Sequence, residues 1–194
     1  MQRPVFMFFL LTCFISSSHL KAQVIFNGDL ENIDPKTNMP VAWTNAMKGG
    51  YTYTLDSNVV YHGKYSICIT SSDAYPYGAI NCVIPYNFTG HTLQLKGFIK
   101  TENVTNGYAG IWMRVNGIDE FDKMEKQNLH GTNDWKEYTI SMPYNSDVAR
   151  SLNVGALLTG KGKMWFDNLR LYLDGKLIEK VPYKPVVEPT VNRP

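Results

Sequence analysis

Residues 131–175 read GTNDWKEYTISMPYNSDVARSLNVGALLTGKGKMWFDNLRLYLDG, and the rest of the chain is organised around this stretch. It contains three runs with the period-two alternation of β-strands, separated by turn residues. Alternation along the last run predicts one inward face, made of Trp165, Asp167, Leu169, Leu171 and Leu173. A buried carboxylate is costly unless it is paired, hydrogen-bonded or bound to a metal. Asp167 is therefore the residue in this row that most needs a structural explanation.

The same strand pattern recurs along the rest of the chain, and no segment sustains the 3.6-residue period of an amphipathic helix. The short runs are separated by turns rich in Gly, Pro, Asn and Asp. This pattern predicts an all-β, two-sheet antiparallel jelly-roll sandwich. The expected strands are 24–31, 51–55, 65–70, 79–84, 93–101, 108–116, 135–142, 152–158 and 164–173. Loops or turns are expected at 71–78, at 102–107 and around 160–163.

Residues 1–22 have the features of a secretory signal peptide. Arg3 precedes an apolar run, 5–11, that is too short to span a membrane. Cleavage after Ala22 would start the mature chain at the next residue. A cut at Cys13, as in a lipoprotein, is the alternative, although the neighbours of Cys13 fit that motif poorly. The sequence therefore predicts export to the periplasm, the cell surface or the medium.

Residues 23–178 are predicted to form one jelly-roll domain, and residues 179–194 a Pro-rich tail or linker. Removal of Arg3 and Lys21 with the signal peptide leaves equal numbers of basic and acidic residues. A formal charge of zero without a basic block argues against a nucleic-acid partner. No segment is long and apolar enough to predict a membrane span. The oligomeric state is not predicted.

Four segments resemble the galactose-binding-like jelly roll: 27–31 (NGDLE), 62–69 (HGKYSICI), 131–140 (GTNDWKEYTI) and 160–175 (GKGKMWFDNLRLYLDG). The resemblance is to the carbohydrate-binding modules of families four and nine. The chain is also similar to the amino-terminal domains of secreted bacterial proteins in which this fold precedes a serine peptidase of the carboxyl-terminal-processing type or an erythromycin-esterase-like enzyme. The shared motifs are mainly structural, so the resemblance implies the fold more strongly than a ligand.

No residue pattern indicates an enzyme. The sequence lacks the Gly-x-Ser-x-Gly, His-Glu-x-x-His and phosphate-loop motifs. Asp119, Glu120, Asp122 and Glu125 cluster in one loop. A solvated loop explains these acids better than the pair of carboxylates that glycoside hydrolysis requires. We therefore expect a non-catalytic domain.

Alternation along 93–101 and 108–116 turns half of the side chains of each strand away from the core. The outward set includes aromatic rings and cations, which can stack on a sugar and hydrogen-bond its hydroxyls. The predicted ligand-binding residues are Trp112, Arg114, Phe98, Lys96, Tyr75 and Tyr77, and Phe121 could close the same groove. The expected ligand is a carbohydrate, and the alternative is a partner protein domain. A further alternative is that the loop 117–130 folds over this face and buries Trp112.

Acidic residues near the two ends of the chain could hold a metal. The resemblance implies a structural calcium between Glu31, with Asp29 as a possible further ligand, and Asp167. A backbone carbonyl from the turn 62–64 would complete the calcium site, since calcium prefers oxygen ligands. The alternative is that Asp167 accepts hydrogen bonds from backbone amides or pairs with Lys64.

Overall fold

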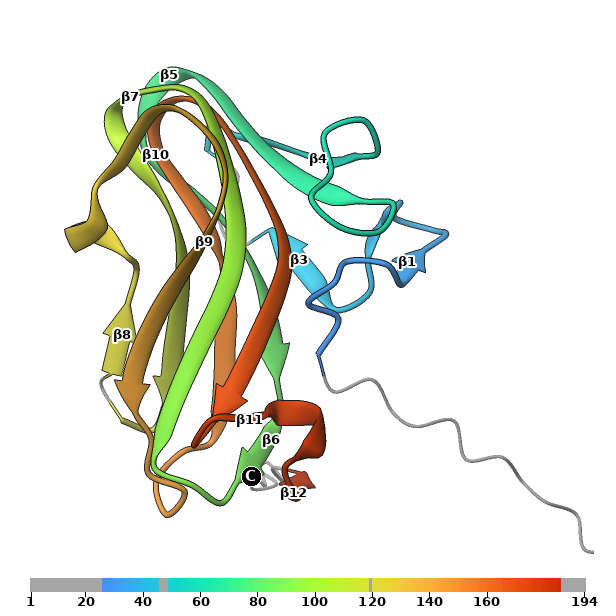
Figure 1. Ribbon diagram of the computed structural model, residues 1–194, viewed down its shortest axis with the longest axis vertical. Helices are drawn as coiled ribbons and strands as arrows, with labels where there is room; N and C mark the ends of the chain where they lie inside the picture. The colour runs from blue at the N-terminus through green and yellow to red at the C-terminus, as the bar shows by residue number, and fades with distance from the viewer. Residues whose placement is uncertain (1–25, 46–48, 119, 186–194) are drawn as a thin grey trace, which may run out of the picture.

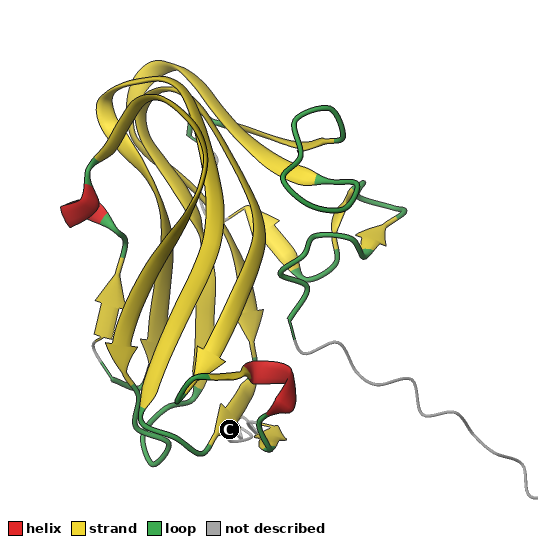
Figure 2. Cartoon of the chain, viewed as in Figure 1, coloured by secondary structure: helices red, strands yellow, loops and turns green. Residues whose placement is uncertain are grey.

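A computed structural model describes residues 26–45, 49–118 and 120–185 of the chain (Figure 1). The predicted signal peptide, residues 1–22, lies outside the described residues. Nearly all of the described secondary structure is β-strand, as Figure 2 shows. No helix within these ranges is long and apolar enough to cross a membrane.

Four long strands form the body of the domain: β5 (Ser66–Ile84), β7 (Thr92–Asn116), β9 (Leu129–Pro143) and β10 (Ser151–Leu173). β10 lies between β5 and β7 and pairs antiparallel with both along most of its length. The long strands bend over at the same end of the molecule, at the top of Figure 1. The sheet therefore folds back on itself, which confirms the predicted antiparallel sandwich.

The two halves of the folded sheet are named here sheet I and sheet II. Sheet I has the strand order β4-β5-β10-β7-β9 and contains β4 (Thr52–Asp56) at one edge. Sheet II has the order β3-β5-β10-β7-β8, with β3 (Trp43–Asn45) and β8 (Glu120–Asp122) at its edges. β7 contributes residues 92–101 to sheet I and residues 108–116 to sheet II.

The bends lie where the sequence predicts loops, but the strands β5, β7 and β10 continue through them without a break. The pairing of β10 shifts register between Leu158 and Lys163. Gly160 and Gly162 have φ angles of 73° and 115° there, and Asn103 on β7 has a φ angle of 53°. Glycine and asparagine tolerate this left-handed conformation better than other residues. Pairs of expected short strands are therefore the two arms of single long strands.

The hydrophobic core lies between the two sheets. The inward side chains of β7 in sheet II are fully buried, as alternation predicts, and they are Ala109, Ile111, Met113 and Val115. Burial of a large aliphatic side chain contributes roughly 1.5–3 kcal/mol to stability. Trp43 extends the core at the edge of sheet II, where its ring centroid lies 5.4 Å from that of Phe166.

Alternation along β10 is interrupted at a bulge. Its pairing with β7 shifts register after Asp167, and such an extra residue reverses the facing of the side chains on one side of it. Phe166 and Leu169 both join the core cluster as a result. The predicted inward position of Trp165 is therefore wrong. Trp165 lies outside that cluster, and its Nε1 donates to Asp56 Oδ2 at 2.8 Å.

The start of the domain differs from the prediction of a strand over 24–31. Residues 26–32 form turn and coil with no strand assignment. Leu30 is buried with a φ angle of 63°, a conformation incompatible with an extended strand. The first paired segments of the described chain are β1 (Ile33–Asp34) and β2 (Met39–Pro40), which pair with each other.

The end of the domain lies later than the predicted boundary at residue 178. β10 is followed by β11 (Lys176–Leu177), by the 3-10 turn η2 (Ile178–Lys180) and by β12 (Tyr183–Pro185). β12 pairs antiparallel with β6 (Tyr86–Phe88), and Val181 belongs to the core cluster. The prediction that the tail begins at residue 179 is therefore wrong, because residues 181–185 pack on the sandwich.

Candidate functional site

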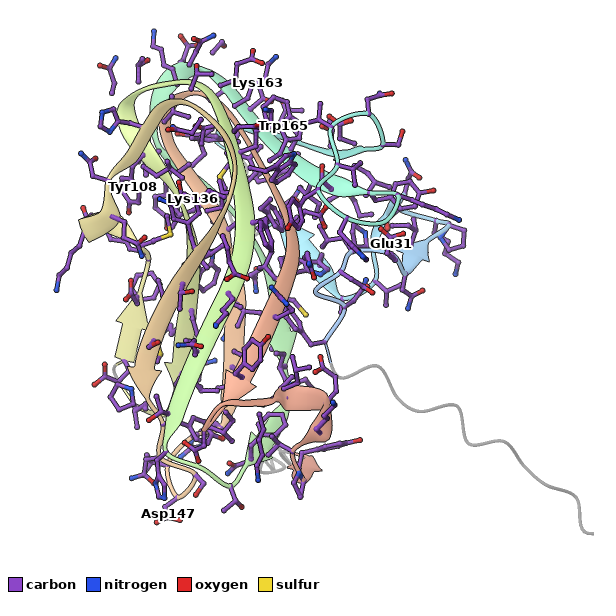
Figure 3. The ribbon with its side chains drawn as sticks, viewed as in Figure 1. Glu31, Tyr108, Lys136, Asp147, Lys163 and Trp165 are labelled. Atoms are coloured by element: carbon purple, nitrogen blue, oxygen red, sulfur yellow. The ribbon has the colours of Figure 1, made fainter. Side chains whose placement is uncertain are left out.

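A groove of about 800 Å³ lies on the outer face of sheet II. Outward side chains of β5, β7 and β10 form its floor. One side is formed by β8 and the segment that follows it up to the 3-10 turn η1 (Glu125–Gln127). Figure 3 shows Tyr108, a groove residue, on the side of the sandwich that carries η1.

Strand pairing sets the order of side chains across the floor. Asn81, Gly155 and Trp112 form one row, because each pairs with its neighbour across antiparallel strands. Asn153 and Arg114 form the next row on the same side, two positions along β10 and β7. Paired residues project to the same side of a sheet. The rows are linked by a hydrogen bond from Asn81 Nδ2 to Asn153 Oδ1 at 3.4 Å.

Trp112 projects away from the core, as alternation predicts, but only 9% of it is exposed. The expectation of an exposed, stacking Trp112 is therefore wrong. Phe121 from β8 covers the indole edge-on, with ring centroids 6.0 Å apart, and Tyr108 and Leu157 pack with it. The alternative that the segment after residue 117 covers this face is therefore confirmed for Trp112.

The indole N–H of Trp112 has no partner in the described part of the protein. Its Nε1 atom is buried and makes no hydrogen bond. A Cβ atom at Gly155 would lie 2.7 Å from this nitrogen, so the N–H edge of the ring lies above bare backbone at the centre of the floor. A buried donor without an acceptor costs free energy and points to a missing partner.

The described lining of the groove contains three charged residues. Lys123 Nζ and Glu125 Oε2 form an ion pair at 3.0 Å. Arg114 is exposed and takes part in none of the ion pairs between described residues. Arg114 is therefore the uncompensated charge among the lining side chains that are described. Nearby, burial raises the pKa of Tyr108, and the charge of Lys123 opposes this rise.

Phe121 and Tyr77 are the exposed aromatic rings of the described lining. Phe121 is 53% exposed and Tyr77 is 43% exposed. Both line the groove, as expected for residues that could close it. The side chain of Tyr75, predicted beside them, lies outside the described part of the chain.

Lys96 and Phe98 do not share this face, and the prediction of one continuous platform is wrong. β7 bends over between Phe98 and Trp112. Phe98 therefore faces outward from sheet I, and Trp112 faces outward from sheet II. Phe98 stacks on Tyr61, with ring centroids 3.6 Å apart and an interplanar angle of 13°. Lys96 Nζ lies 5.4 Å from the centroid of the Tyr172 ring. Short-range alternation could not reveal the bend.

Asp167 is fully buried and held by backbone amides. Its Oδ2 accepts hydrogen bonds from the N–H groups of Tyr61 and His62, each at 2.9 Å, and its Oδ1 accepts from Asn168 N–H at 2.6 Å. Asp167 thus accepts hydrogen bonds from backbone amides, and a calcium between Glu31 and Asp167 stays a prediction. Burial raises the pKa of Asp167 to about 6; the backbone hydrogen bonds oppose the rise, and the charge of Glu31 adds to it.

Glu31 binds the same turn from the other side. Its Oε1 accepts hydrogen bonds from the N–H groups of Lys64 at 2.8 Å and Tyr65 at 3.2 Å. Asp29 is exposed in a turn, and its Oδ1 accepts from Glu31 N–H at 3.4 Å. The described residues hold no cluster of three or more acidic, histidine or cysteine side chains that could bind a metal. The structure thus brings Glu31 and Asp167 together and leaves Asp29 at the surface.

No family model matches the chain. A curated protein of Bacillus subtilis (strain 168), described as the uncharacterized HTH-type transcriptional regulator YbfP, is 30% identical over 125 residues. The match covers 59% of this chain and 41% of that protein, so the chain spans less than half of its relative. A helix-turn-helix needs two packed α-helices, whereas the described helical segments are two three-residue 3-10 turns.

Solved structures share the fold at low sequence identity. The second family 16 carbohydrate-binding module has a TM-score of 0.53 at 12% identity, over 76% of this chain and 98% of that one. The tandem CBM22 domain of Paenibacillus barcinonensis Xyn10C has a TM-score of 0.53 at 14% identity, over 83% and 48%. The enzymatically active domain of bacteriophage CBA120 tailspike protein 4 has a TM-score of 0.55 at 13% identity, over 78% and 21%. These likenesses establish the sandwich fold, while the resemblance to families four and nine and to peptidase-linked domains stays a prediction.

Proposed function

We propose that this domain is a secreted, non-catalytic module that binds a carbohydrate in the groove of sheet II. The observation that carries the proposal is the combination of exposed aromatic rings with a floor of hydrogen-bonding side chains. Sugars present apolar C–H faces that stack on aromatic rings and hydroxyls that need polar partners. The family 16 and CBM22 structures, which are carbohydrate-binding modules by name, support the proposal through their shared fold.

The buried position of Trp112 changes its proposed role. Phe121 and Tyr77 offer exposed ring faces, so they are the rings that stack on the sugar. Trp112 instead donates its unpartnered N–H to a ligand oxygen from the floor. Asn81 and Asn153 place amide groups in the adjoining positions, where they can both donate to and accept from hydroxyls.

The groove lacks the groups for glycoside hydrolysis among its described lining residues. Both common mechanisms need two carboxylates that flank the scissile bond. Glu125 is the carboxylate of the described lining, and it forms an ion pair with Lys123. The likeness to a tailspike enzyme domain therefore supports the fold and not a catalytic role for this groove.

A structural calcium is proposed at Glu31 and Asp167. Each ionised carboxylate offers about four acceptor sites. Backbone N–H groups use three of them on Asp167 and two on Glu31, and the two on Glu31 both go to Oε1, so no hydrogen bond from a described residue occupies Glu31 Oε2. The two carboxylates repel each other, and neither is in an ion pair between described residues. Calcium would offset that repulsion and fix the turn 61–65, with backbone carbonyls as further ligands.

A second candidate function is docking of a partner domain, such as a secreted peptidase or esterase, on sheet I. The favouring observation is an aromatic cluster on its outer face. Tyr61 is 43% exposed, stacks on Phe98 and has its ring centroid 5.9 Å from that of Trp135. Exposed aromatic clusters are typical of binding surfaces.

A glycan-array screen on the mature chain tests the proposed function, followed by titration of each glycan that binds. Truncation of a central anchor should cost about 2 kcal/mol or more, which is more than tenfold in affinity. We expect Phe121→Ala to weaken glycan binding to this extent without lowering the melting temperature. Tyr61→Ala is the matched control on the opposite face and should bind normally. Loss of binding in Tyr61→Ala alone would move the site to sheet I, and a screen without any bound glycan would favour the partner domain.

A further inference from the structure

We propose that the groove selects glycans that carry a carboxylate, such as uronic-acid residues, and that Arg114 recognises this group. This inference rests on the proposed function, because it names the class of carbohydrate that the same groove binds. It starts from the charges of the described lining. Lys123 and Glu125 neutralise each other at 3.0 Å, whereas Arg114 has no acidic partner among the described residues. The described lining therefore carries one net positive charge.

The position of Arg114 suits recognition of a planar anion. Arg114 pairs with Asn153 on one side and with Phe121 on the other, so its side chain extends between a floor amide and the exposed ring. A guanidinium presents its N–H groups in a fork that matches both oxygens of a carboxylate. A sugar stacked on Phe121 would bring a ring substituent within reach of this fork.

Trp112 adds a neutral donor to the same face. It lies two residues before Arg114 on β7, which places the two Cα atoms about 7 Å apart. Its buried Nε1–H lacks an acceptor in the described structure. An ionised carboxylate accepts hydrogen bonds and donates none. It therefore forms a stronger hydrogen bond with such a donor than a neutral hydroxyl does. The unpaired cation and the unpaired donor therefore favour the same kind of ligand.

The test compares glycans that differ in the carboxylate alone. The mature chain is titrated with homogalacturonan, alginate and glucuronoxylan, each beside its carboxyl-reduced form. We expect at least one acidic glycan to bind about tenfold or more tightly than its reduced form, as for a charge-assisted hydrogen bond. Because the contact is ionic, the difference should shrink as salt is raised. Dextran sulfate serves as a probe for unspecific anion binding.

Three variants assign the effect to a residue. Arg114→Gln should remove the preference for the acidic form without a change in melting temperature, because Arg114 is exposed. Arg114→Lys should keep part of it, since the charge remains but the fork is lost. Lys176→Gln removes the same charge from an exposed residue of β11, on the side of sheet I, and should bind like the parent.

The outcomes separate the inference from the proposed function. Equal binding of acidic and reduced forms, unchanged in Arg114→Gln, would overturn the inference and leave the carbohydrate module intact. Equally tight binding of dextran sulfate would overturn the assignment to a carboxylate. If these glycans and the full array all fail to bind the parent chain, the proposed function fails with the inference.

Discussion

Gly155 lies directly across from Trp112 in the pairing of β10 with β7, and the indole covers the space that a side chain at this position would need. A Cβ atom there would lie 2.7 Å from Trp112 Nε1 and 2.0 Å from the carbonyl oxygen of Ile80. The missing side chain lets the indole lie against the sheet with its N–H edge above the floor. This relationship connects the packing of sheet II with the chemistry of the groove.

Gly155→Ala should destabilise the domain by about 1–3 kcal/mol, because the added methyl must displace backbone or indole. Equilibrium unfolding in urea measures this change. Gly49→Ala is the matched control, since nothing lies within 4 Å of its Cβ position and its φ angle is not positive. The control should be neutral or slightly stabilising. Equal stabilities of the two variants would show that the contact between Gly155 and Trp112 is looser than described.

Truncation tests the corrected end of the domain. A chain that stops at residue 180 loses the buried Val181 and the pairing of β12 with β6. Burial of a valine contributes roughly 1.5–3 kcal/mol, so this chain should unfold at a clearly lower urea concentration than one that stops at residue 185. Coincident unfolding curves for the two chains would restore the boundary at residue 178.

Strand alternation predicted what is local in this fold. The inward row of β7 in sheet II follows from the alternation of apolar residues, because successive side chains of a strand point to opposite faces of the sheet. The bend of β7 depends instead on pairing with β10, and it separates Phe98 from Trp112. The bulge after Asp167 likewise reverses the facing of Trp165. Such shifts arise from contacts between distant segments, which a single-strand pattern does not contain.

The candidate site was predictable in part. Alternation placed Trp112 and Arg114 on one outward face, and the structure brings both into the groove with Tyr77 and Phe121. Alternation alone could not decide between an exposed and a buried Trp112, since this depends on where β8 pairs along β7. Asn81 and Asn153 were missed, although both lie within expected strands, 79–84 and 152–158.

The pKa of Asp167 predicts a pH dependence of stability in the absence of calcium. Its folded-state pKa of about 6 is above the ordinary value of 3.8, so the folded state holds this proton more tightly than the unfolded state. The stabilising contribution is therefore complete below about pH 4 and is lost as the pH rises through about 6. In a chelating buffer, the stability of the parent relative to Asp167→Asn should fall between pH 4 and pH 7. A difference that grows with pH would contradict this assignment.

Calcium should stabilise the parent by mass action, because it binds the folded state. At a hundredfold excess over the dissociation constant, the gain is about 2.7 kcal/mol. A chelator should lower the melting temperature of the parent, and Asp167→Asn should abolish the response. Magnesium at the same concentration serves as the ionic-strength control. Identical melts with calcium and with chelator would leave Asp167 as a purely hydrogen-bonded residue.

The most direct test of the groove uses the indole N–H resonances of the protein in a heteronuclear NMR titration with a glycan that binds. Trp43 Nε1 donates to Asn27 O at 2.8 Å and Trp165 Nε1 donates to Asp56, whereas Trp112 Nε1 has no partner among the described residues. We expect the Trp112 signal to move downfield as it gains an acceptor, with those of Trp43 and Trp165 unchanged. A bound glycan that leaves the Trp112 signal in place would contradict the groove as the binding site.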